Sequence, residues 1–156
     1  MIYTKQPHLI DHGTILVTGE IPRETSFETG FLQHRTLTDG IWQPDPLILD
    51  DRAIIFNVKG KGVVVISGCA HAGIINTLHY AQKITEITNV YAVIGGFHLS
   101  GKENENRIEQ TIEELKQMKP KIVVPCHCTG WRGVLATANA LPDAFVYNSV
   151  GNRYVF

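Results

Sequence analysis

Residues 63–71 have the sequence Val-Val-Val-Ile-Ser-Gly-Cys-Ala-His, a run of β-branched residues that ends at a histidine. The pattern occurs twice more, because the apolar runs 90–94 and 122–124 are followed within a few residues by His98 and His127. Short apolar runs bounded by small residues indicate buried strands. Metal-competent side chains just beyond the carboxyl ends of strands are typical of sites in α/β sheets. We therefore expect His71, His98 and His127 to form one site.

The spacing of these histidines supports a common site. His71 precedes His98 by 27 residues, and His98 precedes His127 by 29 residues. Each gap fits one strand–helix–strand unit, which would bring the three strand ends to one edge of a sheet. Neutral imidazole is the commonest metal ligand and suits zinc, iron and manganese. For each histidine taken singly, a structural role with hydrogen-bonded ring nitrogens is the alternative.

Helical periodicity fills the gaps between the strands. The spacing predicts a first helix that begins at residue 74 and a second over residues 105–118, with Pro120 just beyond its end. A third helix is expected after Thr129, which could serve as its N-cap. The apolar stripe expected to face the core in this third helix consists of Val134, Leu135, Ala138 and Leu141.

Further strands are expected on both sides of this region. Residues 14–18 and 53–58 have strand character, and glycines at 60 and 62 suit a hairpin turn into the strand 63–67. Two closing strands are predicted at 145–148 and 154–156. These elements predict an α/β fold with a mixed sheet and packed helices.

The whole chain is expected to form a single domain over residues 1–156. Residues 1–13 are polar and irregular. Residues 23–51 show no sustained period, which predicts a long loop or lid within the domain.

Composition excludes several classes of function. The formal net charge is −1, which gives no reason to expect nucleic acid or a membrane surface as a partner. No segment approaches the ~18 apolar residues of a membrane-spanning helix, and we expect a cytoplasmic protein. Three cysteines, an odd number, do not suggest a disulfide framework.

The cysteines lie close to the candidate histidines. Cys126 and Cys128 flank His127, and two thiols beside an imidazole could chelate zinc. Alternating residues of an extended strand point to opposite faces, however. We therefore favour small buried thiols for Cys126 and Cys128.

Five segments together resemble the metallo-β-lactamase superfamily. The resemblance is strongest to the branch related to 7,8-dihydropterin-6-methyl-4-(β-D-ribofuranosyl)-aminobenzene-5′-phosphate synthase, and it extends in order over essentially the whole chain. The segments are Thr18-Gly-Glu-Ile-Pro-Arg23, Asp50-Asp-Arg-Ala53, Ser67-Gly-Cys-Ala-His-Ala-Gly73, Ile94-Gly-Gly-Phe-His-Leu99 and Pro125-Cys-His-Cys-Thr-Gly130.

The resemblance implies the C-terminal half of an αββα sandwich and a metal-dependent hydrolase or pterin-type synthase. His71 would serve a first metal and His127 a second. His98, near the place of the bridging aspartate usual in the superfamily, would be a ligand or a substrate contact. The cofactor would be a divalent metal, with zinc favoured over manganese, magnesium or iron. Arg23 is a candidate for binding an anionic group of a small substrate.

The His-x-His-x-Asp-His string typical of the superfamily does not occur in this sequence. By resemblance, each metal would keep about one ligand here, so we expect weak or absent metal binding and no catalytic residue on this chain alone. A separately encoded N-terminal half or self-association would complete the site and cover an otherwise exposed apolar sheet face. The alternative is a non-catalytic remnant of the fold that serves in interaction or ligand binding.

Overall fold

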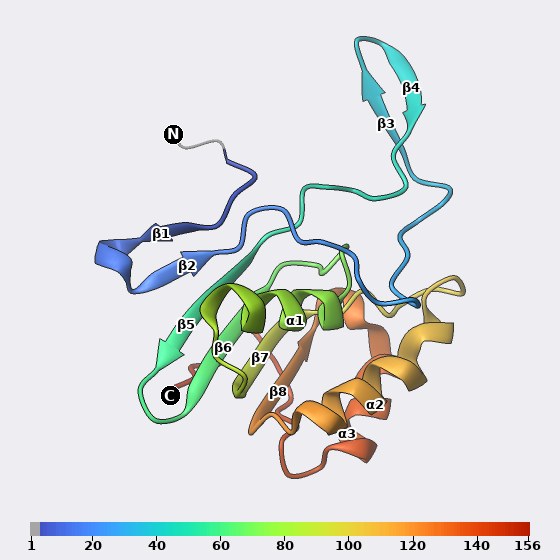
Figure 1. The fold of residues 1–156 in the computed structure, drawn as a ribbon. Helices are drawn as coiled ribbons and strands as arrows, with labels where there is room; N and C mark the ends of the chain where they lie inside the picture. The colour runs from blue at the N-terminus through green and yellow to red at the C-terminus, as the bar shows by residue number, and fades with distance from the viewer. Residues whose placement is uncertain (1–3) are drawn as a thin grey trace.

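A computed structural model describes residues 4–156, and its central element is a six-stranded mixed sheet (Figure 1). The strand order is β1-β2-β5-β6-β7-β8. Pairing is antiparallel from β1 to β6 and parallel from β6 to β8. The strands are β1 (His8–Ile10), β2 (Ile15–Val17), β5 (Ala53–Val58), β6 (Gly62–Ser67), β7 (Val90–Gly96) and β8 (Ile122–Cys126).

Three helices form one layer beside this sheet. They are α1 (Ile74–Thr85), α2 (Ile108–Met118) and α3 (Gly130–Ala140), and short 3₁₀ turns at Glu105–Arg107 and His127–Thr129 lead into the last two. The crossovers from β6 to β7 and from β7 to β8 place α1 and α2 on the same face, and α3 packs against α2 (Figure 1). The expected α/β fold with a mixed sheet and packed helices is confirmed.

The main core lies between the sheet and the helices. Inward-facing strand residues such as Val63, Val65 and Val93 are fully buried against Leu78 of α1 and Leu115 of α2. Parallel pairing brings the carboxyl ends of β6, β7 and β8 to one edge. The core therefore fixes the position of the three loops that follow these strands.

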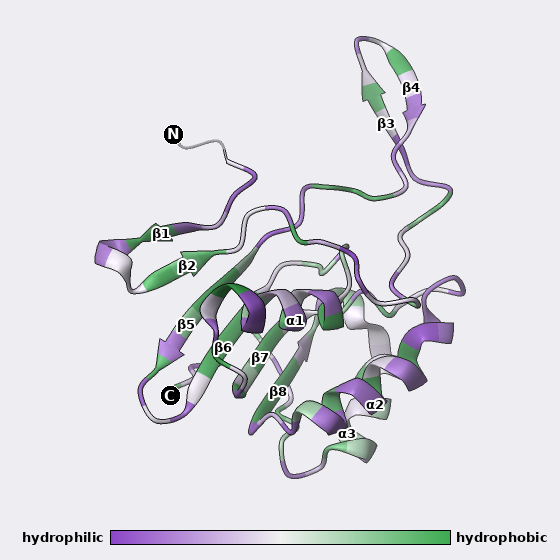
Figure 2. Ribbon diagram, viewed as in Figure 1, coloured by the Kyte–Doolittle hydropathy of each residue, from purple (hydrophilic) through white to green (hydrophobic). Residues whose placement is uncertain are grey.

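The opposite face of the sheet carries a second apolar row. Val17, Ile54, Ile66 and Ile94 are successive partners across four strands, so their side chains share this face. Ile54 is 38% exposed and the other three are half-buried. The hydropathy colouring shows how apolar strands β5 to β8 are (Figure 2).

Helix α3 follows the predicted stripe only in part: Leu141 packs against the core, but the helix also packs through residues outside the stripe. Leu135 is 50% exposed, whereas Gly133 and Thr137 are buried. A β-carbon on Gly133 would lie 2.9 Å from Thr129 Cγ2, so small residues let the helix approach closely. The expected side-chain cap was also wrong, because the Thr129 hydroxyl accepts a hydrogen bond from the Phe97 N–H at 3.0 Å.

Several sequence-based strand assignments need correction. Residues 145–148 and 154–156 form no strands, and Phe145 makes only an isolated bridge to Val123. The region expected to be irregular at the N-terminus contains β1; residues 1–3 of that region lie outside the described part of the chain.

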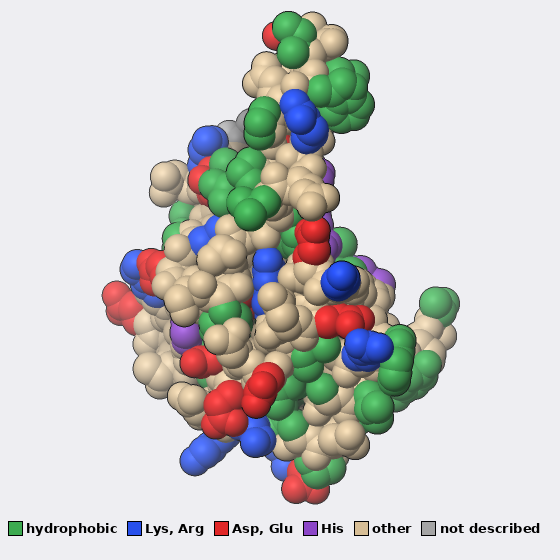
Figure 3. All heavy atoms as spheres, turned by 90° about the vertical axis from the view of Figure 1, so that its right-hand side faces the viewer, with side chains coloured by type: hydrophobic (Ala, Val, Ile, Leu, Met, Phe, Trp, Pro, Cys, Tyr) green, Lys and Arg blue, Asp and Glu red, His purple; other side chains and the backbone are tan. Residues whose placement is uncertain are grey.

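The segment 23–51 contains a hairpin that the sequence did not predict. Strands β3 (Arg35–Thr38) and β4 (Ile41–Pro44) pair with each other and stand out from the body of the molecule (Figures 1 and 3). All eight of their residues are exposed, including Leu37 and Trp42. Among residues 4–156, no helix combines the length and apolar character needed to cross a bilayer.

Candidate metal centre

The three predicted histidines lie at the carboxyl edge of the sheet. His71 is in the loop after β6, His98 follows β7, and His127 begins the turn after β8. The rings of His71 and His98 pack edge to face with their centroids 4.9 Å apart. His127 Nε2 lies beside Gly96 at the end of β7. The fold thus brings together residues that are far apart in the sequence.

Two aspartates lie beside His71. Asp50 Oδ1 is 2.9 Å from His71 Nδ1, and Asp51 Oδ2 accepts a hydrogen bond from the Ala72 N–H at 3.0 Å. The three side chains can each offer an atom to a metal, all within 4.8 Å of one another. Alternatively, Asp50 orients the His71 ring and leaves its Nε2 as the ligand. Both aspartates belong to the segments that resemble the superfamily, but no local sequence pattern assigns either one a role.

His98 has a strained backbone conformation and a buried ring nitrogen. Its backbone has φ of 47°, and its buried Nδ1 has no hydrogen-bond partner among the described residues. Burial lowers the pKa of the ring, and the nearby His71 and Arg107 lower it further. A neutral imidazole with an unused nitrogen is suited to bind a metal or a substrate group.

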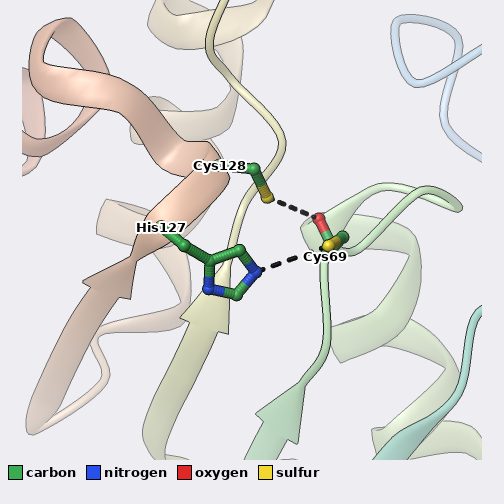
Figure 4. A group of neighbouring side chains, drawn as sticks. All are labelled: Cys69, His127 and Cys128. Carbon is green, nitrogen blue, oxygen red and sulfur yellow. Dashed lines mark hydrogen bonds between the residues drawn. The ribbon is translucent and has the colours of Figure 1, made fainter. Parts of the chain in front are cut away.

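His127 lies in a group with two cysteines. Its Nε2 is 3.4 Å from Cys69 Sγ, and the Cys128 thiol donates to the Cys69 carbonyl at 3.3 Å (Figure 4). One ligand atom from each of these residues lies within 4.8 Å of the others. Burial raises the pKa of Cys128 to about 12. No sequence feature had linked Cys69 to this group.

The sequence argument that Cys126, His127 and Cys128 do not all point to one metal agrees with the structure, because Cys126 is outside the group. Its assumption of an extended strand does not hold beyond Cys126, because residues His127–Thr129 form a 3₁₀ turn, which brings Cys128 beside His127. Cys126 remains in β8, and its thiol donates to the Val124 carbonyl at 3.3 Å. The structure therefore separates the two cysteines that flank His127.

The guanidinium of Arg23 donates hydrogen bonds to backbone carbonyls. Its Nη1 donates to the His71 carbonyl at 2.6 Å, and its Nη2 donates to the Leu47 carbonyl. Burial lowers the pKa of the guanidinium, while Asp51 acts in the opposite direction. Arg23 braces the loop that carries His71, and contact with substrate stays a prediction.

A cavity of about 620 Å³ opens beside His71 and His98. Much of its wall comes from the segment 23–51, and His127 does not line it. Phe31 packs against His98 with ring centroids 4.6 Å apart. The lining residues are Phe31, Gln33, His34, Asp45, Ile48, Leu49, Asp50, His71, His98 and Glu103.

The donor atoms at this edge fit divalent metal ions. Imidazole and carboxylate around His71 suit a range of divalent cations, whereas thiols and imidazole around His127 suit zinc. His98 Nδ1, which is buried and has no hydrogen-bond partner within residues 4–156, is a further donor or acceptor.

The whole fold is similar to a known crystal structure, a metal-dependent hydrolase of the β-lactamase superfamily. The TM-score is 0.80 with 24% sequence identity, over 97% of this chain and 56% of the other. This chain has a metallo-β-lactamase fold. The expectation from the five sequence segments is confirmed at the level of the fold.

Two curated proteins of Methanocaldococcus jannaschii are similar to this chain in sequence. One is 7,8-dihydropterin-6-methyl-4-(β-D-ribofuranosyl)-aminobenzene-5′-phosphate synthase, 43% identical over 54% of this chain and 28% of its own length. The other, uncharacterized, is 34% identical over 94% of this chain and 51% of its own length. The chain thus spans about half or less of the relatives it matches. No protein-family model matches it.

Proposed function

We propose that this chain supplies one side of the metal centre of a metal-dependent hydrolase or pterin-type synthase. The observation that carries the proposal is the convergence of His71 and His98, with Asp50 and Asp51, at one edge of the sheet beside a cavity. The similarity to a synthase and to a metal-dependent hydrolase supports this class of activity.

A divalent metal bound here would lower the pKa of a bound water and polarise the reacting group. In the proposal, Asp50 holds the His71 ring and His98 remains neutral at its buried position. Arg23 fixes the loop through the His71 carbonyl. These residues position ligand atoms and do not themselves react.

The charge of the cavity bears on its substrate. Three carboxylates line it, from Asp45, Asp50 and Glu103. They would repel an anionic substrate unless a bound cation offset their charge. We therefore propose that a small anionic substrate binds only after the metal.

The remaining ligands, in this proposal, come from outside residues 4–156, either from a separately encoded N-terminal half or from a second copy. The exposed Ile54 on an apolar sheet face supports such a contact. The His71 group alone then binds metal weakly, and the isolated chain has little activity. A cytoplasmic location is part of the proposal, because three unpaired cysteines suit a reducing compartment.

Manganese titration tests the site, because Mn²⁺ prefers carboxylate and imidazole over thiolate ligands. Electron paramagnetic resonance monitors the binding of Mn²⁺, and we expect it to be weak. His71→Ala should lower the affinity at least about tenfold, since even residues that only orient a metal ligand contribute about 10–100-fold to metal affinity. His79→Ala, a helix histidine in α1, should bind as the wild type does. No manganese binding, or equal binding in His71→Ala, would instead favour a non-catalytic remnant.

A further inference from the structure

Cys69, His127 and Cys128 form a compact group of two thiols and one imidazole that is distinct from the His71 group. Their candidate ligand atoms lie within 4.8 Å of one another, and the side chains converge from two separate loops (Figure 4). We infer that these three residues form a thiophilic metal site that takes zinc with Cys₂His ligation and one open position. The site has no residue in common with the His71 group of the proposed function, and it needs no residue outside this chain.

The distances suit a zinc ion after a small adjustment. Zinc–sulfur bonds of about 2.3 Å and zinc–nitrogen bonds of about 2.0 Å in a tetrahedron place neighbouring ligand atoms about 3.5–3.8 Å apart. Cys69 Sγ and His127 Nε2 are already 3.4 Å apart. Since no pair exceeds 4.8 Å, side-chain movements of about 1 Å or less would complete the set.

The surrounding backbone holds the two loops in place for this arrangement. The Thr129 hydroxyl accepts the Phe97 N–H at 3.0 Å, which ties the turn after β8 to the end of β7. The Gly68 carbonyl accepts the Gly96 N–H at 2.9 Å, which ties the loop after β6 to the same strand. Both donor loops are therefore anchored to β7, between them.

Access and coordination number point to an open site. His127 is exposed, while Cys69 and Cys128 are half-buried. Three protein ligands with a fourth position left for water or substrate characterise catalytic zinc sites, including Cys₂His sites, whereas structural sites use four. On binding, both thiols release their protons to solvent, and two metal–sulfur bonds form, which neutralises the charge of the ion.

Ligand chemistry separates this site from the one around His71. Thiolates favour zinc and other soft ions, and carboxylates favour manganese and magnesium. The two groups should therefore respond to different metals. A negative result in the manganese experiment would therefore not count against the zinc site, and a negative result with zinc would not count against the His71 site.

Cobalt substitution tests the inference directly, because thiolate-to-cobalt charge-transfer absorption reports metal–sulfur bonds. The reduced full chain is titrated with Co²⁺ and then with Zn²⁺ as competitor. We expect an absorption band at one cobalt per chain that zinc abolishes. Cys69→Ser and Cys128→Ser should each lower the affinity for zinc at least about tenfold, since even residues that only orient a metal ligand contribute about 10–100-fold to metal affinity.

Cys126→Ser is the matched control, because this thiol is half-buried next to His127 but bonds to the Val124 carbonyl instead. Cys126→Ser should keep the cobalt absorption band. His71→Ala should also keep it, and its expected loss of manganese binding tests the proposed function separately. The inference is overturned if folded wild-type protein shows no band. It is equally overturned if the band persists in both Cys69→Ser and Cys128→Ser. Circular dichroism of every variant confirms folding.

Discussion

Gly96 determines how closely the end of β7 approaches the donor atoms of the neighbouring loop. A β-carbon there would lie 2.4 Å from Cys128 Sγ and 2.5 Å from His127 Nε2. The backbone at Gly96 does not have a positive φ, so space and not conformation excludes a side chain. The close approach is what allows the thiol and imidazole to converge.

Gly96→Ala should therefore displace His127 and Cys128. We expect loss of the cobalt band, with a destabilisation smaller than the ~1–3 kcal/mol of core overpacking, because both atoms are ends of side chains that can turn away. Gly68→Ala is the control, because a β-carbon at Gly68 would meet nothing within 4 Å. Urea unfolding measures the stability of both variants. Equal stability and equal cobalt binding in the two would refute the steric argument.

Glu28 caps helix α1 from a distant part of the chain. Its carboxylate accepts the N–H groups of Ile75 at 3.0 Å and Asn76 at 2.7 Å, where the local N-cap, Gly73, has no side chain to offer. Burial raises the pKa of Glu28, and the two hydrogen bonds offset this in part. The folded state consequently holds the Glu28 proton more tightly than the unfolded state does.

The sign of the resulting pH dependence follows from linkage. A raised folded-state pKa gives a stability contribution that is full below the ordinary value of 4.5 and is lost as pH rises through the folded-state pKa. Glu28→Gln cannot titrate. The unfolding free energy of the wild type minus that of Glu28→Gln should therefore fall as pH rises from about 4 to 8. Urea unfolding at several pH values checks this, and a difference that grows with pH would contradict it.

Among the elements, the helices show where sequence periodicity succeeds and where it fails. The spacing predicts the second helix over residues 105–118, which agrees with α2, and Leu115 of this helix is fully buried. The spacing also predicts a core-facing stripe that contains Leu135 of α3, but this residue is 50% exposed. Hydropathy predicts that Leu135 faces the core, yet the buried residues of α3 are Gly133 and Thr137, which have low hydropathy.

Truncation of these two leucines separates the two cases. Leu115→Ala should cost about 2–5 kcal/mol of unfolding free energy, as a large-to-small change in a packed core does. Leu135→Ala should stay within about 0.5 kcal/mol, as is usual at a surface position. Urea unfolding of both variants measures the contrast. A large loss in Leu135→Ala would show that this residue is covered in solution.

Turns explain what could not be predicted around the metal centre. The strand-end histidines could be found because buried parallel strands have a strong apolar signal. Cys128 could not, because its direction depends on a 3₁₀ turn that a strand pattern does not reveal. Asp50 reaches His71, and Glu28 reaches the start of α1, across long sequence separations, and no local pattern encodes those contacts.

At the scale of the whole molecule, the sequence predicts the region from β5 to α3 well and the flanks poorly. Strands β3 and β4 are exposed throughout and therefore lack the apolar alternation that identifies a half-buried strand. The segment after α3 has strand-like residues but finds no partner beyond a single bridge at Phe145. Whether these segments form strands therefore depends on the tertiary contacts they make and not on their composition.

The apolar row on the open sheet face leads to a prediction about assembly. If a second copy covers this face, the wild type should be larger than a monomer by light scattering at micromolar concentration. Ile54→Lys should then convert it to a monomer, because a buried charge at the contact is costly. Leu37→Lys, on the projecting hairpin and 56% exposed, is the control. A folded, strictly monomeric wild type would argue against self-association.

The mixed pairing of the sheet also has a kinetic consequence. β5 and β6 are joined by a tight turn and can pair locally, whereas the parallel pairings of β6 with β7 and of β7 with β8 each require a helical crossover. Loop closure makes such non-local pairings slow. The donor side chains come from the ends of these strands, so they should meet only late in folding. Bound metal should accordingly slow unfolding while leaving the folding rate nearly unchanged.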